Sequence, residues 1–400
     1  MDNNIKPFDV IISGAGLSGA TMALALAKLQ KKDGSRLSIA VIENLAIDDN
    51  LPSSFDARVI ALANGSGQYL HQLNVWQHIQ ADAMAIETIH ISDRGHYGKA
   101  RMYAQDYDVN ALGYVVEMQA IGNGLFKALK SYDNVQFFSP ESITDITWQR
   151  DSVNVTLASN TKLQASLLIA CDGAQSQCRQ LAGIECDQYD YQQVAIIANV
   201  STELAHQGRA FERFTDTGPI AMLPMTDNRS SLVWTVSPEQ VDRLMALNDT
   251  EFATELQQAF GHYLGTINKV GTRFSFPLRL LRARESTYHR MALVGNASHT
   301  LHPIAGQGFN LGVRDVEQLV HVVANALAHD EDIGCFNTLQ GYADDRDVDH
   351  QQVISLTDSL VHLFSNNYPP LALARGVGLK ALNYLSPLKQ LLAHKTMGHR

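Results

Sequence analysis

The chain has 400 residues, of which 45% are hydrophobic, so we expect two or three substructures around a large packed core and no extensive disorder. A net charge of −10, without a block of Lys or Arg residues, argues against a nucleic-acid-binding protein. The four cysteines lack C-x-x-C spacing, and the N-terminal apolar run is too short for a signal peptide or a membrane span. We therefore expect a cytoplasmic protein with reduced thiols.

A βαβ unit is predicted at the N-terminus. An apolar run at 8–13 precedes a glycine-rich turn, and a helical pattern follows it through Met22, Leu26 and Leu29. The glycines of the turn are Gly14, Gly16 and Gly19. The next apolar run ends in Glu43, about 20 residues further on, where a carboxylate reaches the ribose of a bound dinucleotide. A lone glycine-rich turn is weak evidence, but strand, helix and acid occur here together. The alternative is an ordinary βαβ unit whose Glu43 is only solvated.

The middle of the chain contains a second strand-to-turn signal. Arg58 stands among apolar residues, as surface side chains with a buried stem often do. Alternating residues at 134–157 predict a β-hairpin. The apolar run 166–170 ends in Asp172-Gly173, and Arg179 follows about two helical turns later. By itself, Asp-Gly at a strand end indicates no more than a turn.

A second substructure is predicted downstream. Several β-like runs lie between 194 and 236, and a helical pattern covers 238–260. Together with a strand at 86–93, they favour a mostly antiparallel sheet with helices on one face. The next apolar strand begins near Ala292, so the N-terminal domain is discontinuous in sequence.

The stretch 292–319 combines a strand, a loop and an amphipathic helix. Two glycines lie where the helix begins, and its free N–H groups and dipole favour negative charge there. An isolated G-x-G would simply shape a turn. The strand ends in Gly295-Asn296, and the loop and the first helical turn contain His302, Pro303, Gly306, Gln307, Gly308, Phe309 and Asn310.

Residues after Gly334 are predicted to be helical to the end of the chain. Apolar and basic residues alternate between Leu371 and Leu391. We favour a helical cap packed on the core over a membrane-surface or partner-docking helix.

The motifs G-x-G-x-x-G, D-G-x-x-S-x-x-R and P-x-x-G-Q-G-x-N-x-G, in this order, resemble those of the FAD-dependent aromatic hydroxylases. The segments FDARVIAL, GYVVE and GPIAMLP are similar to the ubiquinone-biosynthesis branch, and most of all to the 2-polyprenyl-6-methoxyphenol hydroxylases. Two positions depart from the pattern. Asn296 stands where most members have Asp, although its amide oxygen still accepts a hydrogen bond, and Gln119 stands where many have Arg.

This resemblance implies an α/β fold, with a Rossmann-like FAD-binding domain, an inserted, mostly antiparallel β-sheet substrate domain and C-terminal helices. The implied FAD-binding segments are 1–75, 100–182 and 285–345. The implied substrate domain covers 76–99 and 183–284, and residues 346–400 form the helical segment. Met222, Leu223 and Phe211 are expected to line the substrate pocket.

The resemblance also implies the site. The cofactor contacts are expected from Gly14, Gly16, Gly19, Glu43, Arg58, Asp172, Gly173, Arg179, Gly295, Asn296, Gly306, Gln307, Gly308, Phe309 and Asn310. His302, Pro303 and Gly306 are expected at the flavin face. No residue is identified as a proton-transfer base, and no metal is expected, because Pro303 and the adjacent glycines oppose a helical His299/His302 pair.

The implied activity is hydroxylation of a polyprenylated phenol, with NAD(P)H reducing the FAD and O2 forming a flavin hydroperoxide. Only one dinucleotide fingerprint occurs, so the nicotinamide is expected to visit and leave. Expected partners are the phenol, other ubiquinone-biosynthesis proteins and the surface of the inner membrane. Alternatives are an FAD-dependent reductase of an isoprenoid lipid, or a flavin-bound assembly or sensor protein without activity.

Overall fold

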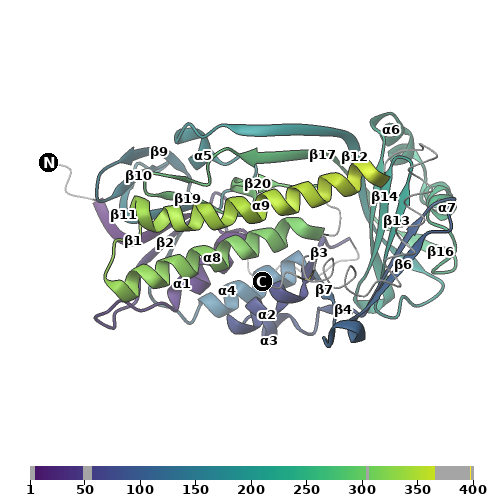
Figure 1. Cartoon of the computed structure of the whole chain (residues 1–400), viewed down its shortest axis with the longest axis horizontal. Coiled ribbons are helices and arrows are strands. Elements are labelled where there is room, and N and C mark those ends of the chain that lie inside the picture. The colour runs from purple at the N-terminus through teal and green to yellow at the C-terminus, as the bar shows by residue number, and fades with distance from the viewer. Residues whose placement is uncertain (1–4, 48–55, 303–305, 365–396, 398–400) are drawn as a thin grey trace.

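A computed structural model describes residues 5–47, 56–302, 306–364 and 397. One sheet lies at each end of the elongated molecule, and the helices α8 and α9 run lengthwise beside them (Figure 1). The long strands β12 and β17 extend from the second sheet toward the first (Figure 1). All four cysteines are free thiols, as predicted.

The first sheet has a parallel centre. Its order is β18-β19-β11-β1-β2-β8, and the hairpin β9–β10 pairs with β11. The strands are β1 (Ile5–Ser13), β2 (Ile39–Ile42), β8 (Val135–Phe138), β9 (Ile143–Trp148), β10 (Val153–Leu157), β11 (Lys162–Ala170), β18 (Thr287–Tyr288) and β19 (Met291–Leu293). β1, β2, β11 and the β9–β10 hairpin were predicted, because continuous or alternating apolar runs mark them locally.

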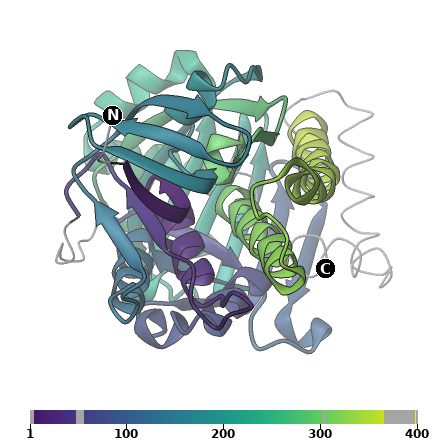
Figure 2. The same ribbon diagram turned by 90° about the vertical axis from the view of Figure 1, so that its left-hand side faces the viewer.

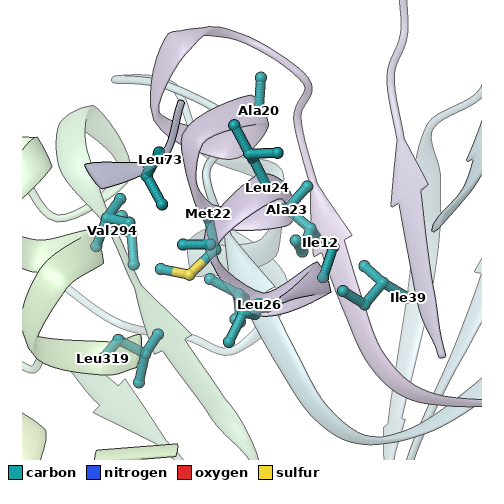
Figure 3. Packing of buried hydrophobic residues seen from close by; sticks show 14 of the residues in the cluster. Ile12, Ala20, Met22, Ala23, Leu24, Leu26, Ile39, Leu73, Val294 and Leu319 are labelled. Carbon is teal, nitrogen blue, oxygen red and sulfur yellow. The ribbon is translucent and has the colours of Figure 1, made fainter. Parts of the chain in front are cut away.

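Helices cover one face of this sheet. α1 (Leu17–Ala27), α4 (Met118–Leu129) and α8 (Gln307–His329) bury a continuous apolar cluster against β1 and β2. Met22 of α1 packs between Val294 and Leu26 in this cluster (Figure 3). α9 (Phe336–Phe364) lies alongside α8 (Figure 2). The short α5 (Gln177–Leu181) and the β9–β10 hairpin cover the opposite face.

The second sheet is antiparallel except for one pair. Its order is β20-β17-β12-β15-β14-β13-β5-β6, with β16 beside β12, and only β13 and β5 are parallel. The strands are β5 (Thr88–Asp93), β6 (Lys99–Tyr103), β12 (Cys186–Thr202), β13 (Arg209–Thr215), β14 (Gly218–Pro224), β15 (Arg229–Val236), β16 (Ile267–Val270), β17 (Phe274–Ala283) and β20 (His299–Thr300). α6 (Pro238–Ala246) and α7 (Asp249–Phe260) pack on one face, where a single helix was predicted. Asn248 caps α7 and separates the two helices.

A small third sheet, in the order β3-β7-β4, lies between the other two. Its strands are β3 (Val59–Ala63), β4 (Met84–Ile86) and β7 (Gly113–Glu117), and the remaining elements are α2 (Asn64–Gln72), α3 (Trp76–Ile79) and the 3-10 turns at Ala104–Tyr107, Thr226–Asn228 and Gly295–Ala297. The strand pairing moves one expected domain boundary. Strand β6 belongs to the second sheet, so a division between 99 and 100 would cut through it.

Within the described residues, no helix combines the length and apolar character needed to cross a lipid bilayer. The amphipathic stretch 371–391 lies outside the described residues. Met397 is described, and its side chain is 4% exposed among Ile86, Met102 and Met225. Met397 is therefore part of the apolar core beside β4 and β6.

We expect Met397→Ala to lower the stability of the protein, because it empties a packed apolar position, at a cost of about 2 kcal/mol. Scanning calorimetry should show a melting temperature lower by several degrees. Leu204→Ala is the control, since Leu204 is 52% exposed and should leave the melting temperature unchanged. An unaltered Met397→Ala melting curve would show that this contact contributes nothing.

Candidate functional site

The carboxyl ends of four neighbouring parallel strands meet at one edge of the first sheet. Ser13 of β1 is in register with both Ile42 and Ala170, and Ala170 is in register with Leu293. The residues that follow these strand ends are the glycine-rich turn, Glu43, Asp172-Gly173 and Gly295-Asn296. Motifs from the first and the last third of the chain are thus placed side by side at the edge where such sheets bind ligands.

The three glycines of the first turn have different roles. Gly14 has φ +94°, and a Cβ there would lie 2.6 Å from the carbonyl oxygen of Cys171. A Cβ on Gly19 would collide with the backbone of Gly14. By contrast, a Cβ on Gly16 would meet no atom within 4 Å. Gly14 and Gly19 are therefore required by the fold, while Gly16 leaves open space at the start of α1.

Glu43 is positioned next to this turn. Its carboxylate accepts hydrogen bonds from the backbone N–H of Ala15 (2.7 Å) and of Leu45 (3.0 Å). The side chain is half-buried. These two bonds place the carboxylate beside the glycine-rich turn. Its contact with a ribose stays a prediction.

Asp172 and Arg179 organise the turn after β11. Asp172 Oδ2 accepts from the N–H of Cys178 (3.0 Å), whereas Oδ1 is buried without a donor among the described residues. The guanidinium of Arg179 is buried and donates to the carbonyls of Ala297 (2.7 Å) and Ala174 (2.8 Å). Arg179 thus ties this turn to the Gly295 turn. Gly173, at φ +83°, faces open space.

A buried network of charged side chains supports the Gly295 turn. Asp315 of α8 accepts the N–H of Gly295 (2.9 Å) with Oδ2, and its Oδ1 accepts from Arg346 Nε (2.7 Å) and His350 Nε2 (2.8 Å). Burial alone would raise the pKa of Asp315, but the facing His350 and Arg346 outweigh it and hold the pKa below its ordinary value. Asn296 itself is exposed at the site edge.

His299, Asp315 and His350 also have the composition of a metal site, since their ligating atoms lie within 4.8 Å of one another. However, Arg346 donates to the same carboxylate, so a metal ion would be placed beside a buried guanidinium. Burial lowers the pKa of His299 to about 3, so this ring is neutral at pH 7. We interpret the cluster as a support for the Gly295 turn.

The N-terminus of α8 completes the site. Gly306 caps this helix at φ +62°, and a Cβ there would lie 2.9 Å from Cβ of Ala61 on β3. The amide of Asn310 donates to the carbonyls of Ala61 and Gly306 and accepts the N–H of Ala63, each at 2.8 Å. Asn310 therefore fixes the helix start on β3. A Cβ on Gly308 would meet open space. Gln307 is buried and Phe309 is half-buried.

The remaining expected residues lie around this edge. Arg58 is exposed just before β3, and its carbonyl accepts the N–H of Met118 (2.8 Å). His302 is buried, with Nε2 3.2 Å from Gln193 Oε1, and burial lowers its pKa to about 4. It is therefore neutral at pH 7. Pro303 lies outside the described residues.

These features fit an FAD. Open space above Gly16 suits a pyrophosphate on the N-terminus of α1, and the buried Asp172 oxygen suits a ribityl hydroxyl. Residues 7–355 match the family described as an FAD binding domain. The chain belongs to the FAD-dependent aromatic hydroxylases. It is a monooxygenase of their ubiquinone-biosynthesis branch, and FAD is its cofactor.

Three relatives place the hydroxylase in this branch. It is 36% identical to the ubiquinone hydroxylase UbiL of Rhodospirillum rubrum, over 98% of this chain and 90% of that protein. It is 32% identical to the 3-demethoxyubiquinol 3-hydroxylase of Escherichia coli, over 96% and 97%. It is 31% identical to the mouse mitochondrial ubiquinone biosynthesis monooxygenase COQ6, over 96% and 89%.

Solved structures have the same fold. The p-nitrophenol 4-monooxygenase PnpA of Pseudomonas putida matches with a TM-score of 0.79 at 18% identity, over 99% of this chain and 100% of that one. PqsL of Pseudomonas aeruginosa matches with a TM-score of 0.76 at 18% identity, over 94% and 100%. The expected α/β fold is confirmed.

One expectation about the substrate pocket is wrong. Phe211 and Met222 pack beneath α6 and α7, in the core on the far side of the second sheet. Leu223 points to the opposite face, with Met102 and Ala210. Because side chains alternate along a strand, the sequence could have shown that Met222 and Leu223 lie on opposite faces of the sheet. It could not show which of the two faces the helices cover, since that depends on how the strands pair.

We expect Gly16→Val to fold and to lose FAD affinity by at least about tenfold, since its side chain would fill the space over the start of α1 (more than about 1.4 kcal/mol). Quenching of FAD fluorescence measures the binding. Gly14→Val is not a suitable test, because it would clash with Cys171 and destabilise the fold. A folded Gly16→Val variant with wild-type FAD affinity would show that the pyrophosphate does not bind at this position.

We expect Asp315→Asn to cost about 3 kcal/mol, because the buried Arg346 loses one of its two carboxylate partners and keeps only Asp349. The lowered pKa of Asp315 means that its contribution is present above the unfolded carboxyl pKa and is lost as pH falls toward the folded value. Urea unfolding at neutral pH and at low pH measures this, and FAD affinity should also fall. Exposed Asp344→Asn is the control. If the two variants were equally stable at neutral pH, the network around Asp315 would make no contribution to the free energy of unfolding.

Proposed function

We propose that this hydroxylase uses NAD(P)H and O2 to hydroxylate a polyprenylated phenol in ubiquinone biosynthesis. The observation that carries this proposal is the arrangement of the site. Three FAD motifs converge at one sheet edge, and the second sheet turns to them a face that carries an aliphatic row, namely Ile91, Ala221, Val233 and Ile197. Similarity to UbiL and to COQ6 supports the same class of substrate.

The chain's own residues suit this reaction. The start of α8, with Gly306 and Gly308, presents backbone N–H groups and a helix dipole that stabilise negative charge. The bound flavin, once reduced, supplies the activation of O2 for attack on an electron-rich ring. Aliphatic side chains on the facing sheet suit a phenol with an isoprenoid chain and exclude water.

The nicotinamide is proposed to be a visiting reductant. The G-x-G-x-x-G pattern occurs once in the sequence, after β1, and in this proposal FAD would occupy that turn. NAD(P)H would therefore approach the flavin from solvent, reduce it and leave.

A polyprenylated phenol is almost insoluble in water. We therefore propose that the enzyme acts in the cytoplasm at the surface of the inner membrane, where it meets the substrate and other ubiquinone-biosynthesis proteins. No described helix spans a bilayer, so this contact would be peripheral.

The test uses the FAD-loaded full chain and a soluble analogue of 2-polyprenyl-6-methoxyphenol with one isoprene unit. We expect the phenol to stimulate NAD(P)H oxidation and O2 consumption in equal amounts, with a hydroxylated product identified by mass spectrometry. The Gly16→Val variant should show no stimulation. A reductase of isoprenoid lipids would instead consume NAD(P)H without O2, and a non-catalytic flavoprotein would respond to neither.

A further inference from the structure

Glu212 lies on β13 between two residues that point away from the flavin site. Phe211 packs against Phe260 of α7, and Arg213 Nε donates to the carbonyl of Ala259 (3.1 Å). Because successive side chains of a strand alternate between its faces, Glu212 projects from the opposite face of the second sheet.

That opposite face is turned to the FAD-binding part of the molecule, as three contacts show. Asn199 Nδ2 donates to the carbonyl of Ala57 (2.8 Å), one residue before Arg58. Arg229 forms a buried ion pair with Glu117 at the end of β7 (2.9 Å). Gln193 contacts His302, immediately before the flavin loop. Glu212 therefore faces the same interdomain space.

The carboxylate stands alone in an apolar row. Backbone pairing places Ala221 of β14 and Ile91 of β5 directly beside Glu212. The same row continues through Val233 of β15 to Ile197 of β12. A phenol ring lying on this row would meet aliphatic surface on both sides and one carboxylate.

Among the described residues, no charge is paired with that of Glu212. In the described part of the chain, its carboxylate has neither a hydrogen-bond donor nor an ion-pair partner. Burial raises its pKa to about 7. The other titratable groups on this face are Asp93, the Arg229–Glu117 pair, and Tyr191, whose ring lies edge-on to that of His302 and whose pKa burial and the charge of Asp358 raise.

Keeping an unpartnered carboxylate in an apolar row costs stability. The residue is half-buried, so part of its surface remains accessible on this face. Isolated carboxyl groups of this kind occur where proton transfer is needed near neutral pH. The sequence motifs had identified no such group.

We propose that Glu212 is the general base that accepts the proton of the substrate's phenolic hydroxyl. The proposal rests on the function proposed above. The phenol O–H bond breaks, its electron pair stays on the phenolic oxygen, and the proton forms an O–H bond with the Glu212 carboxylate. The phenolate is more electron-rich at its ring carbons and so more readily hydroxylated. Glu212 returns the proton when the hydroxylated product recovers its phenolic O–H.

The test compares Glu212→Gln and Glu212→Asp with the wild type in the FAD-loaded full chain, using the same one-isoprene phenol. Glu87→Gln is the matched control, because it makes the same chemical change at an exposed position in the same domain. We expect Glu212→Gln to lower the phenol-dependent hydroxylation rate by about 100-fold, within the usual contribution of acid–base catalysis. Glu212→Asp should recover part of that rate, and FAD affinity should be unchanged in both variants.

Two further readouts separate a proton-transfer role from a structural one. The wild-type rate should rise with pH through about 7, since only the ionised carboxylate accepts a proton, and this dependence should vanish in Glu212→Gln. The second readout uses a nitrophenol with a pKa of about 7 as a probe, because a carboxylate of similar pKa can take its proton without a reaction. Difference spectra of this probe bound to the oxidised enzyme should show a larger phenolate fraction with wild type than with Glu212→Gln.

The outcomes distinguish the two proposals. If the wild type hydroxylates the phenol and Glu212→Gln retains its rate, pH profile and phenolate spectrum, Glu212 is not the base. If the nitrophenol probe is bound as phenolate only when Glu212 is present but the one-isoprene phenol is not hydroxylated, the proposed function fails and the base assignment stands. If wild type and Glu212→Gln bind the probe with the same phenolate fraction, the base assignment is overturned whatever the rate.

Discussion

The structure depends on the register of four parallel strands. β1, β2, β11 and β19 end at the same level, so the turns that follow them form one continuous edge. Backbone hydrogen bonds enforce this level, from Gly14 N–H to Ile42 O (2.7 Å), Cys171 N–H to Ser13 O (2.7 Å) and Val294 N–H to Ala170 O (2.9 Å). A shift of one residue in any strand would withdraw its turn from the cofactor.

Glycine turns cannot hold themselves in place, because they lack side chains. The polar residues around them supply that support, and each does so through backbone groups. Arg179 joins the second turn to the third, Asp315 accepts the N–H of Gly295, and Asn310 bonds three backbone groups around β3. These buried side chains satisfy their hydrogen bonds within the protein and leave the open space to the ligand.

The sequence predicted the parts of this site that are local. Strand, turn and helix signals located Gly16, Glu43, Asp172 and the start of α8, because each follows directly from neighbouring residues. It assigned Arg179 and Asn310 to the cofactor through resemblance, whereas the structure shows their side chains bonded to backbone groups. The Asp315 network was missed, since its partners lie on α9 and only tertiary packing brings them together.

The second sheet was predicted as a class but not in its orientation. Its alternating strands indicate two unlike faces, and nothing local says which face the helices cover. α6 and α7 cover one face of the second sheet. The roles of the polar residues on the other face can then be inferred from their contacts. Arg229 and Asn199 are bonded across the domain boundary, which fixes the second sheet relative to the flavin edge. Because Arg229 and Asn199 are bonded in this way, their side chains hold the two domains together. In our proposal the proton transfer between the domains therefore falls to Glu212, which has no such bond in the described part of the chain.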